Sequence, residues 1–227
     1  MSVKHLFEAC CQSHEEAMEA RAGGAGRVEL CAELGIGGVT PSESEIRQTL
    51  AQCSLPVNVL VRPRGGSFVY SESEAWAMLR DMELCKSLGV NGVVIGALTP
   101  EGRVDIPLMR RLIEAARPMK ITFHRAFDEC AEPFSALEDI INLGCDILLT
   151  SGQAPSAYDG RKLIAELVQK AGDRIVVMPG AGINPRNISE IALVTKASEF
   201  HGSAHGPAGA TDRKVVEAIV RALSDIR

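Results

Sequence analysis

The most chemically informative segment of the chain runs from Ile121 to Cys130 and reads ITFHRAFDEC. It begins as an apolar β-strand and then places His124, Arg125 and Asp128 where more apolar residues would continue the strand. Taking a charged group out of water costs several kcal/mol unless the group is paired. We therefore expect His124 to face a polar site at the strand end, and Asp128 to pair with Arg125 or Arg64 in the turn that follows.

Further reactive side chains lie near the ends of three other predicted strands. They form three pairs at alternate positions, namely Glu8 with Cys10, Glu29 with Cys31, and Arg62 with Arg64. Because alternate residues of a strand face the same side of a sheet, the two members of each pair point the same way. An arginine fork matches a carboxylate with two parallel hydrogen bonds, so we expect Glu8 or Glu29 to form a buried ion pair with Arg62.

These residue types suit acid–base chemistry on a small anion. Carboxylates beside a histidine can move protons, which makes Glu8, Glu29, Arg62 and His124 the candidate catalytic residues. Backbone N–H groups of glycine-bearing turns and cationic side chains bind anions. The candidate anion-binding residues are Arg64, Arg125, Ser151, Gly180, Gly182, His201 and Ser203.

Three other interpretations of the same residues stay open. The charged side chains would also serve as a structural ion-pair network, and the glycines as tight turns. The carboxylates and histidines at positions 8, 29, 124 and 201 are alternatively ligands for a divalent ion.

The elements that position these groups alternate along the whole chain. Short apolar runs rich in β-branched residues are separated by segments with the periodicity of amphipathic helices. Helix-start signals include Ser13, Thr40 before Pro41, and Asp105. The predicted strands are residues 5–9, 27–31, 57–62, 92–98, 120–124, 146–150, 174–179 and 198–203.

Eight strand–helix units without a linker predict one (β/α)₈ TIM barrel, an α/β fold, spanning residues 1–227 as a single domain. Such barrels have about 250 residues. The main alternative is a doubly wound open sheet, but the first strand–helix turn, EACCQSH, lacks a glycine-rich dinucleotide fingerprint. The carboxyl ends of barrel strands carry the active site. The candidate residues gather at those ends, whereas the opposite ends carry mostly glycine, proline and ordinary surface residues.

Composition restricts the partners. The net charge of −5 and the absence of a basic tract argue against nucleic acid. We expect no membrane association, since no apolar run reaches about 18 residues. The amino terminus has no signal-peptide pattern, so we expect a cytoplasmic protein. Its seven cysteines, with no CxxC spacing, are then expected to be reduced thiols.

Several motifs in register resemble the CutC copper-homeostasis family. They span Glu8 to about Ser203 and are ELC at 29–31, GGVTPS at 37–42, VRPRGGSFVYS at 61–71, TFHRAFD at 122–128, LTSGQ at 149–153 and VVMPGAGI at 176–183. The resemblance implies a barrel, a cytoplasmic setting, a homodimer and Cu(I) binding. The chain departs from the family after the last strand, where only AHGPAGAT precedes the final helix.

The family's proposed copper ligands fall on Cys10 and Cys31. Thiolates are soft ligands that suit Cu(I), and two opposed cysteines near the barrel axis would hold it in linear coordination. Two further hypotheses remain. One is an isomerase, lyase or hydrolase acting on a small phosphorylated or carboxylated substrate; the other is an oligomeric scaffold without catalysis.

Overall fold

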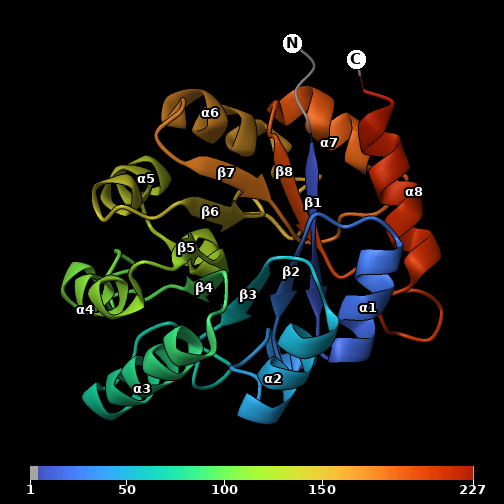
Figure 1. Cartoon of the computed structure of the whole chain (residues 1–227). Helices are drawn as coiled ribbons and strands as arrows, with labels where there is room; N and C mark the ends of the chain where they lie inside the picture. Colours follow the sequence, from blue (N-terminus) through green and yellow to red (C-terminus); the bar gives the residue numbers. More distant parts are fainter. Residues whose placement is uncertain (1–4, 227) are drawn as a thin grey trace.

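A computed structural model describes residues 5–226 of the chain and contains eight strands and eight α-helices in strict alternation (Figure 1). The strands are β1 (Leu6–Cys11), β2 (Arg27–Leu30), β3 (Val57–Leu60), β4 (Gly92–Ile95), β5 (Lys120–Phe123), β6 (Ile147–Thr150), β7 (Val176–Pro179) and β8 (Glu199–Gly202). The helices are α1 (His14–Ala22), α2 (Glu43–Gln52), α3 (Glu72–Leu88), α4 (Ile106–Ala116), α5 (Pro133–Asn142), α6 (Arg161–Ala171), α7 (Ile188–Thr195) and α8 (Arg213–Ser224). Two 3₁₀ turns, η1 (Leu34–Ile36) and η2 (Arg125–Glu129), follow β2 and β5.

The strands are parallel and follow one another in sequence order, with β1 also paired to β8. Among the described residues β7 and β8 share no backbone ladder, yet they lie side by side and bring the sheet almost to closure (Figure 1). A doubly wound sheet reverses its strand order at a switch point, and this sheet does not. The predicted (β/α)₈ barrel is therefore confirmed.

Of the helix-start signals at Ser13, Thr40 and Asp105, two are confirmed and one is wrong. Ser13 and Asp105 accept backbone hydrogen bonds at the starts of α1 and α4, as predicted. Thr40 does not cap α2, because Ser42 does so by accepting from the N–H of Glu45. The Thr40 hydroxyl instead accepts from the backbone N–H of Arg62 at 3.0 Å and so ties the loop before α2 to the end of β3.

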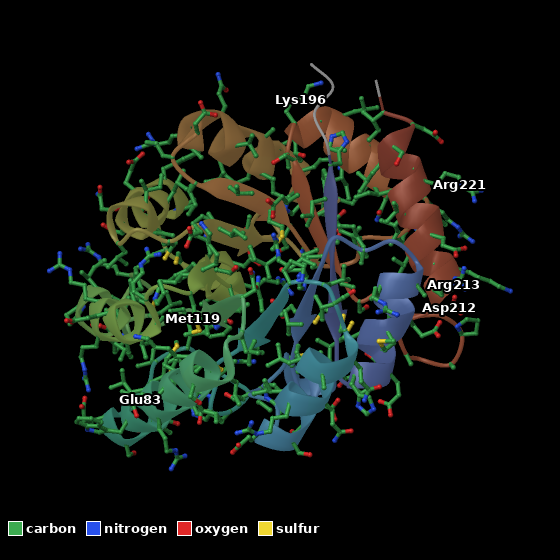
Figure 2. The ribbon with its side chains drawn as sticks, in the orientation of Figure 1. Glu83, Met119, Lys196, Asp212, Arg213 and Arg221 are labelled. Atoms are coloured by element: carbon green, nitrogen blue, oxygen red, sulfur yellow. The ribbon has the colours of Figure 1, made fainter. Side chains whose placement is uncertain are left out.

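Most of the apolar core lies between the barrel wall and the helices. Helix α8 illustrates the pattern, since Val216, Ile219 and Leu223 are buried while Arg213 and Arg221 extend outward (Figure 2). None of the described helices is both long and apolar enough to cross a membrane.

Inside the barrel, the apolar side chains of the described residues form two small groups. One contains Cys10, Cys31, Leu60 and Val94, and the other Ile147, Leu149 and Met178. Buried polar residues fill the remaining interior, among them Glu8, Arg27, Glu29, Asn58 and His201. A barrel interior with this many buried charges needs pairing partners for each of them.

Candidate functional site at the barrel mouth

A cavity of about 270 Å³ opens at the carboxyl ends of the strands. Three of the four candidate catalytic residues line it, namely Glu29, Arg62 and His124. Of the candidate anion-binding residues, Arg125, Gly182, His201 and Ser203 also line it. Ser203 begins the short segment before α8, which an antiparallel bridge between His205 and Thr211 closes.

The other candidates lie around the cavity and do not line it. Glu8 is fully buried beneath it on β1. Arg64 turns away to form an ion pair with Glu74 of α3. Gly180 lies beside the cavity, where an added Cβ would meet Leu149 at 2.5 Å.

The expected ion pair between Arg62 and Glu8 or Glu29 is wrong. Glu8 is instead paired with Arg27 and lies 2.9 Å from Nδ1 of His201. Burial by itself would raise the pKa of Glu8, but the hydrogen bond with His201 and the charge of Arg27 outweigh it and lower the pKa to about 2. Glu8 is therefore an ionised, fully partnered carboxylate and a poor candidate for proton transfer.

Arg62 organises the loops around the mouth. Its guanidinium donates to the carbonyl oxygens of Gly37 and Gly38 at 3.0 Å and of Gly66 at 2.7 Å. The ring of Phe68 covers it, with Cζ 4.6 Å from the ring centre. Its Nε is buried and has no hydrogen-bond partner among the described residues. Arg62 thus joins the β2 and β3 loops, lines the cavity and keeps one buried N–H without a partner among the described residues.

His124 is held neutral in a fixed orientation. Its Nδ1 accepts from the N–H of Ala126 at 3.1 Å, so the ring proton resides on Nε2. Burial, together with the charge of Arg62, lowers its pKa to about 3. The ring lies over Gly96, where an added Cβ would be 2.5 Å from Nδ1. Nε2 is buried without a partner among the described residues, which makes it a free donor beside the cavity.

Glu29 has the opposite electrostatic character from Glu8. Burial is the main reason why its pKa is raised, and nearby Glu8 adds to the shift. Its Oε2 has no partner among the described residues, and its Oε1 accepts weakly from the Cys10 thiol at 3.6 Å. A carboxyl group with a raised pKa in a cavity is suited to giving and taking a proton.

The two predicted metal ligands do meet. Sγ of Cys10 and Sγ of Cys31 lie 3.7 Å apart at the ends of β1 and β2. Both residues are buried, and Leu34, Leu60 and Val94 pack around them. The hydrogen bond with Cys31 and burial raise the pKa of the Cys10 thiol well above its usual value. Cys11, the next residue, has its thiol near Thr211 and does not belong to this pair.

Asp128 binds the loop after β6, and the expected pairing with Arg125 is confirmed at 2.8 Å. Its carboxylate also accepts from the backbone N–H of Ser151 at 3.0 Å, from the Ser151 hydroxyl at 2.9 Å and from the backbone N–H of Gln153 at 3.2 Å. Thr150 donates its hydroxyl to the same carboxylate. Ser151 therefore holds this turn together and does not face the cavity.

Three residues of the site were not predicted from the sequence. Arg27 and Asn58 hold Glu8 from neighbouring strands, and Phe68 covers both Arg62 and His124. Alternation offered a signal for Arg27, because it shares a strand face with Glu29. Phe68 sits in an irregular loop, where no periodicity indicates its orientation.

Comparison with known proteins assigns this chain to a family. Residues 5–206 match the model of the CutC family. This chain belongs to the CutC family. A CutC family protein of Parabacteroides distasonis is 55% identical over 203 residues, which cover 89% of this chain and 84% of the relative. Another from Chromobacterium violaceum is 48% identical over 201 residues, covering 88% of this chain and 81% of the relative.

Solved structures support the same assignment. The crystal structure of CutC from Streptococcus agalactiae matches with a TM-score of 0.83 and 30% identity, covering 88% of this chain and 98% of that protein. Phosphoribosyl anthranilate isomerase from Thermotoga maritima matches with a TM-score of 0.64 at 14% identity, covering 97% of this chain and 98% of that protein. The second likeness shows the barrel fold alone. The CutC resemblance seen in the sequence is confirmed.

Proposed function

We propose that this CutC family member binds Cu(I) through Cys10 and Cys31 at the barrel mouth and acts in copper homeostasis. The observation that carries the proposal is the buried pair of thiols with Sγ atoms 3.7 Å apart. The name of the Streptococcus agalactiae relative, a copper homeostasis protein, supports it.

The donor set suits the metal. Thiolates are the ligands that Cu(I) prefers, and apolar surroundings protect a soft, redox-active ion from water. Metal–thiolate bonds of about 2.3 Å place the sulfurs of a linear site about 4.6 Å apart, so the thiols must separate by about an ångström to accept the ion. Binding also releases the thiol protons of both Cys10 and Cys31, because the thiolate is the ligand.

Anaerobic titration of the reduced protein with Cu(I) against a competing chelator tests the proposal. We expect one tightly bound ion, lost in Cys10→Ser and in Cys31→Ser. Cys11→Ser is the matched control, because Cys11 is an equally buried neighbour whose thiol lies near the Ala9 carbonyl and Thr211 instead of Cys31. Binding that survives both cysteine substitutions, or that Cys11→Ser also abolishes, would refute the thiol-pair site.

A second candidate function is acid–base catalysis on a small carbonyl or carboxylate compound, with or without a phosphate. Three buried polar atoms favour it, because they have no partners among the described residues: Oε2 of Glu29, Nε of Arg62 and Nε2 of His124. All three residues line one cavity. Unpaired buried polar atoms are costly and cluster at functional sites. Arg62 and neutral His124 would polarise a carbonyl oxygen while Glu29 moves the proton.

Thermal-shift screening with small phosphorylated and carboxylated compounds tests this second function. We expect a stabilising ligand whose effect disappears in His124→Asn and persists in Cys31→Ser. A scaffold without a ligand would show no shift with any compound in the wild-type chain.

The cellular setting completes the proposal. We propose a reducing cytoplasm, which suits a chain whose seven cysteines are all unpaired and buried in the described region. The homodimer stays a prediction, and light scattering coupled to size-exclusion chromatography tests it.

A further inference from the structure

Cys10 belongs to a second cluster that does not include Cys31. Cys10, Glu29 and His201 each offer one ligand atom, and these atoms all lie within 4.8 Å of one another. All three residues are buried and line the cavity at the barrel mouth. A tetrahedral ion with bonds of about 2.0–2.3 Å holds its ligands about 3.3–3.8 Å apart. The three ligand atoms therefore need to approach one another by about an ångström. Sγ of Cys10 already has the required spacing from one Glu29 oxygen, Oε1, at 3.6 Å.

The mixture of donors selects the ion. A thiolate, an imidazole and a carboxylate together suit Zn²⁺, which accepts sulfur, nitrogen and oxygen ligands in one site. Cu(I) prefers sulfur and gains little from a carboxylate. The thiolate of Cys10 and the carboxylate of Glu29 would balance the two charges of the ion. A neutral assembly is what a buried site requires, since an uncompensated charge there is costly.

The surroundings of His201 already have the form of a metal site. Metal-binding histidines almost always donate their other ring N–H to a carboxylate, a backbone carbonyl or a water molecule, which fixes the ring. Nδ1 of His201 lies 2.9 Å from Oε1 of Glu8. Arg27 and Asn58 hold the other oxygen of Glu8 in turn. This arrangement leaves Nε2 of His201 as the nitrogen available to an ion.

Two further features point to a ligand at this position. Oε2 of Glu29 is buried without a partner among the described residues, as a carboxylate oxygen reserved for an ion would be. Three protein ligands beside a cavity also leave a fourth position open, as in catalytic zinc sites. We propose that Cys10, Glu29 and His201 form a site for Zn²⁺ or a similar divalent ion, open to the cavity and distinct from the thiol pair.

Because both sites use Cys10, they cannot be occupied at the same time. Substitutions of the ligands that they do not share distinguish one site from the other. The test titrates the reduced, metal-free protein with Zn²⁺ against a chromophoric chelator, and records the thiolate-to-metal absorption of the Co²⁺ form. We expect Glu29→Gln and His201→Gln to weaken Zn²⁺ binding by about tenfold or more, as loss of a ligand or its support does. We expect Cys31→Ser to leave Zn²⁺ affinity nearly unchanged while abolishing Cu(I) binding.

Glu45→Gln provides the matched control. His14, Glu15 and Glu45 form the other cluster of potential ligands among the described residues, outside the barrel. Weakening of Zn²⁺ binding by Glu45→Gln, or by Cys31→Ser as strongly as by Glu29→Gln, overturns the proposal. An absence of thiolate-to-cobalt absorption in the wild type also overturns it. Circular dichroism confirms that each variant is folded, and failure of this site leaves the Cu(I) proposal intact.

Discussion

Glu8 and His201 are 193 residues apart in the sequence and lie 2.9 Å apart inside the barrel. They belong to β1 and β8, the first and last strands of the chain, which pair in one parallel ladder. The hydrogen bond is part of a buried network, since Glu8 also pairs with Arg27, and Arg27 contacts Glu199 at 2.6 Å. The contact between the first and last strands and the support of the mouth thus depend on the same carboxylate.

Removing the charge of Glu8 should therefore destabilise the fold. Glu8→Gln leaves His201 buried without its anion and Arg27 with Glu199 alone, and breaking a buried ion pair costs about 3–5 kcal/mol. Urea denaturation at neutral pH measures the loss. Glu199→Gln is the control, because Glu199 is less buried than Glu8 and Arg27 keeps its ion pair with Glu8 in that variant, so we expect a smaller loss. Equal losses in the two variants would show that Glu8 has no special role in holding β1, β2 and β8 together.

The hydrogen bonds between Asp128 and the loop after β6 lead to a second prediction. Asp128→Ala removes the acceptor of several hydrogen bonds from Thr150, Ser151 and Gln153, and leaves their donors unpaired. We expect a loss of about 2–3 kcal/mol and faster amide hydrogen exchange at residues 151–153. Arg125→Ala should cost about 1 kcal/mol or less, because that side chain is 45% exposed. Unchanged exchange in Asp128→Ala would mean that other contacts hold the loop.

The sequence predicted the elements and which side chains share a strand face. Alternation grouped Glu8 with Cys10 and Glu29 with Cys31, the family resemblance paired the two cysteines, and the strand end placed His124 at the mouth. It did not predict which cation meets Glu8. That choice depends on strand register, which puts Glu8 opposite Arg27 in the β1–β2 ladder. Arg62 lies beyond the end of β3, too far along its strand to pair there.

The conformation of the loops was the other feature that could not be predicted from the sequence. Arg64 was expected at an anion site, but the capping box of α3 places Glu74 beside it, and the two form an ion pair instead. Such contacts depend on how an irregular segment folds back on itself, and side-chain periodicity carries no information about that. Phe68, which covers Arg62 and His124, was unpredicted for the same reason.

Gly96 makes room for His124, and this contact gives a third prediction. In Gly96→Ala the new Cβ would lie 2.5 Å from Nδ1 of His124, so the ring must move or the strand must shift. Overpacking of this kind costs about 1–3 kcal/mol. Gly35→Ala is the control, because an added Cβ there meets no atom within 4 Å. The cost at Gly96 should shrink in a His124→Ala background, and a cost that stays constant would place the strain elsewhere.

The buried neutral state of His124 predicts how stability depends on pH. Its pKa is about 3 in the folded chain and near 6.5 in the unfolded chain, so between these values only the unfolded chain takes up the proton. Stability contributed by His124 is therefore present above pH 6.5 and decreases as the pH falls below it. At pH 5 the loss amounts to about 2 kcal/mol.

His124→Asn isolates this effect, because an asparagine side chain can still accept from the N–H of Ala126 and does not titrate. Between pH 7 and pH 5, we expect the unfolding free energy of the wild type to fall by about 2 kcal/mol more than that of the variant. Urea denaturation at the two pH values measures it, and other titrating groups cancel in the comparison. If the stability of the two proteins depended on pH in the same way, His124 would take up a proton as readily in the folded chain as in the unfolded chain. His124 would then not be a neutral donor beside the cavity.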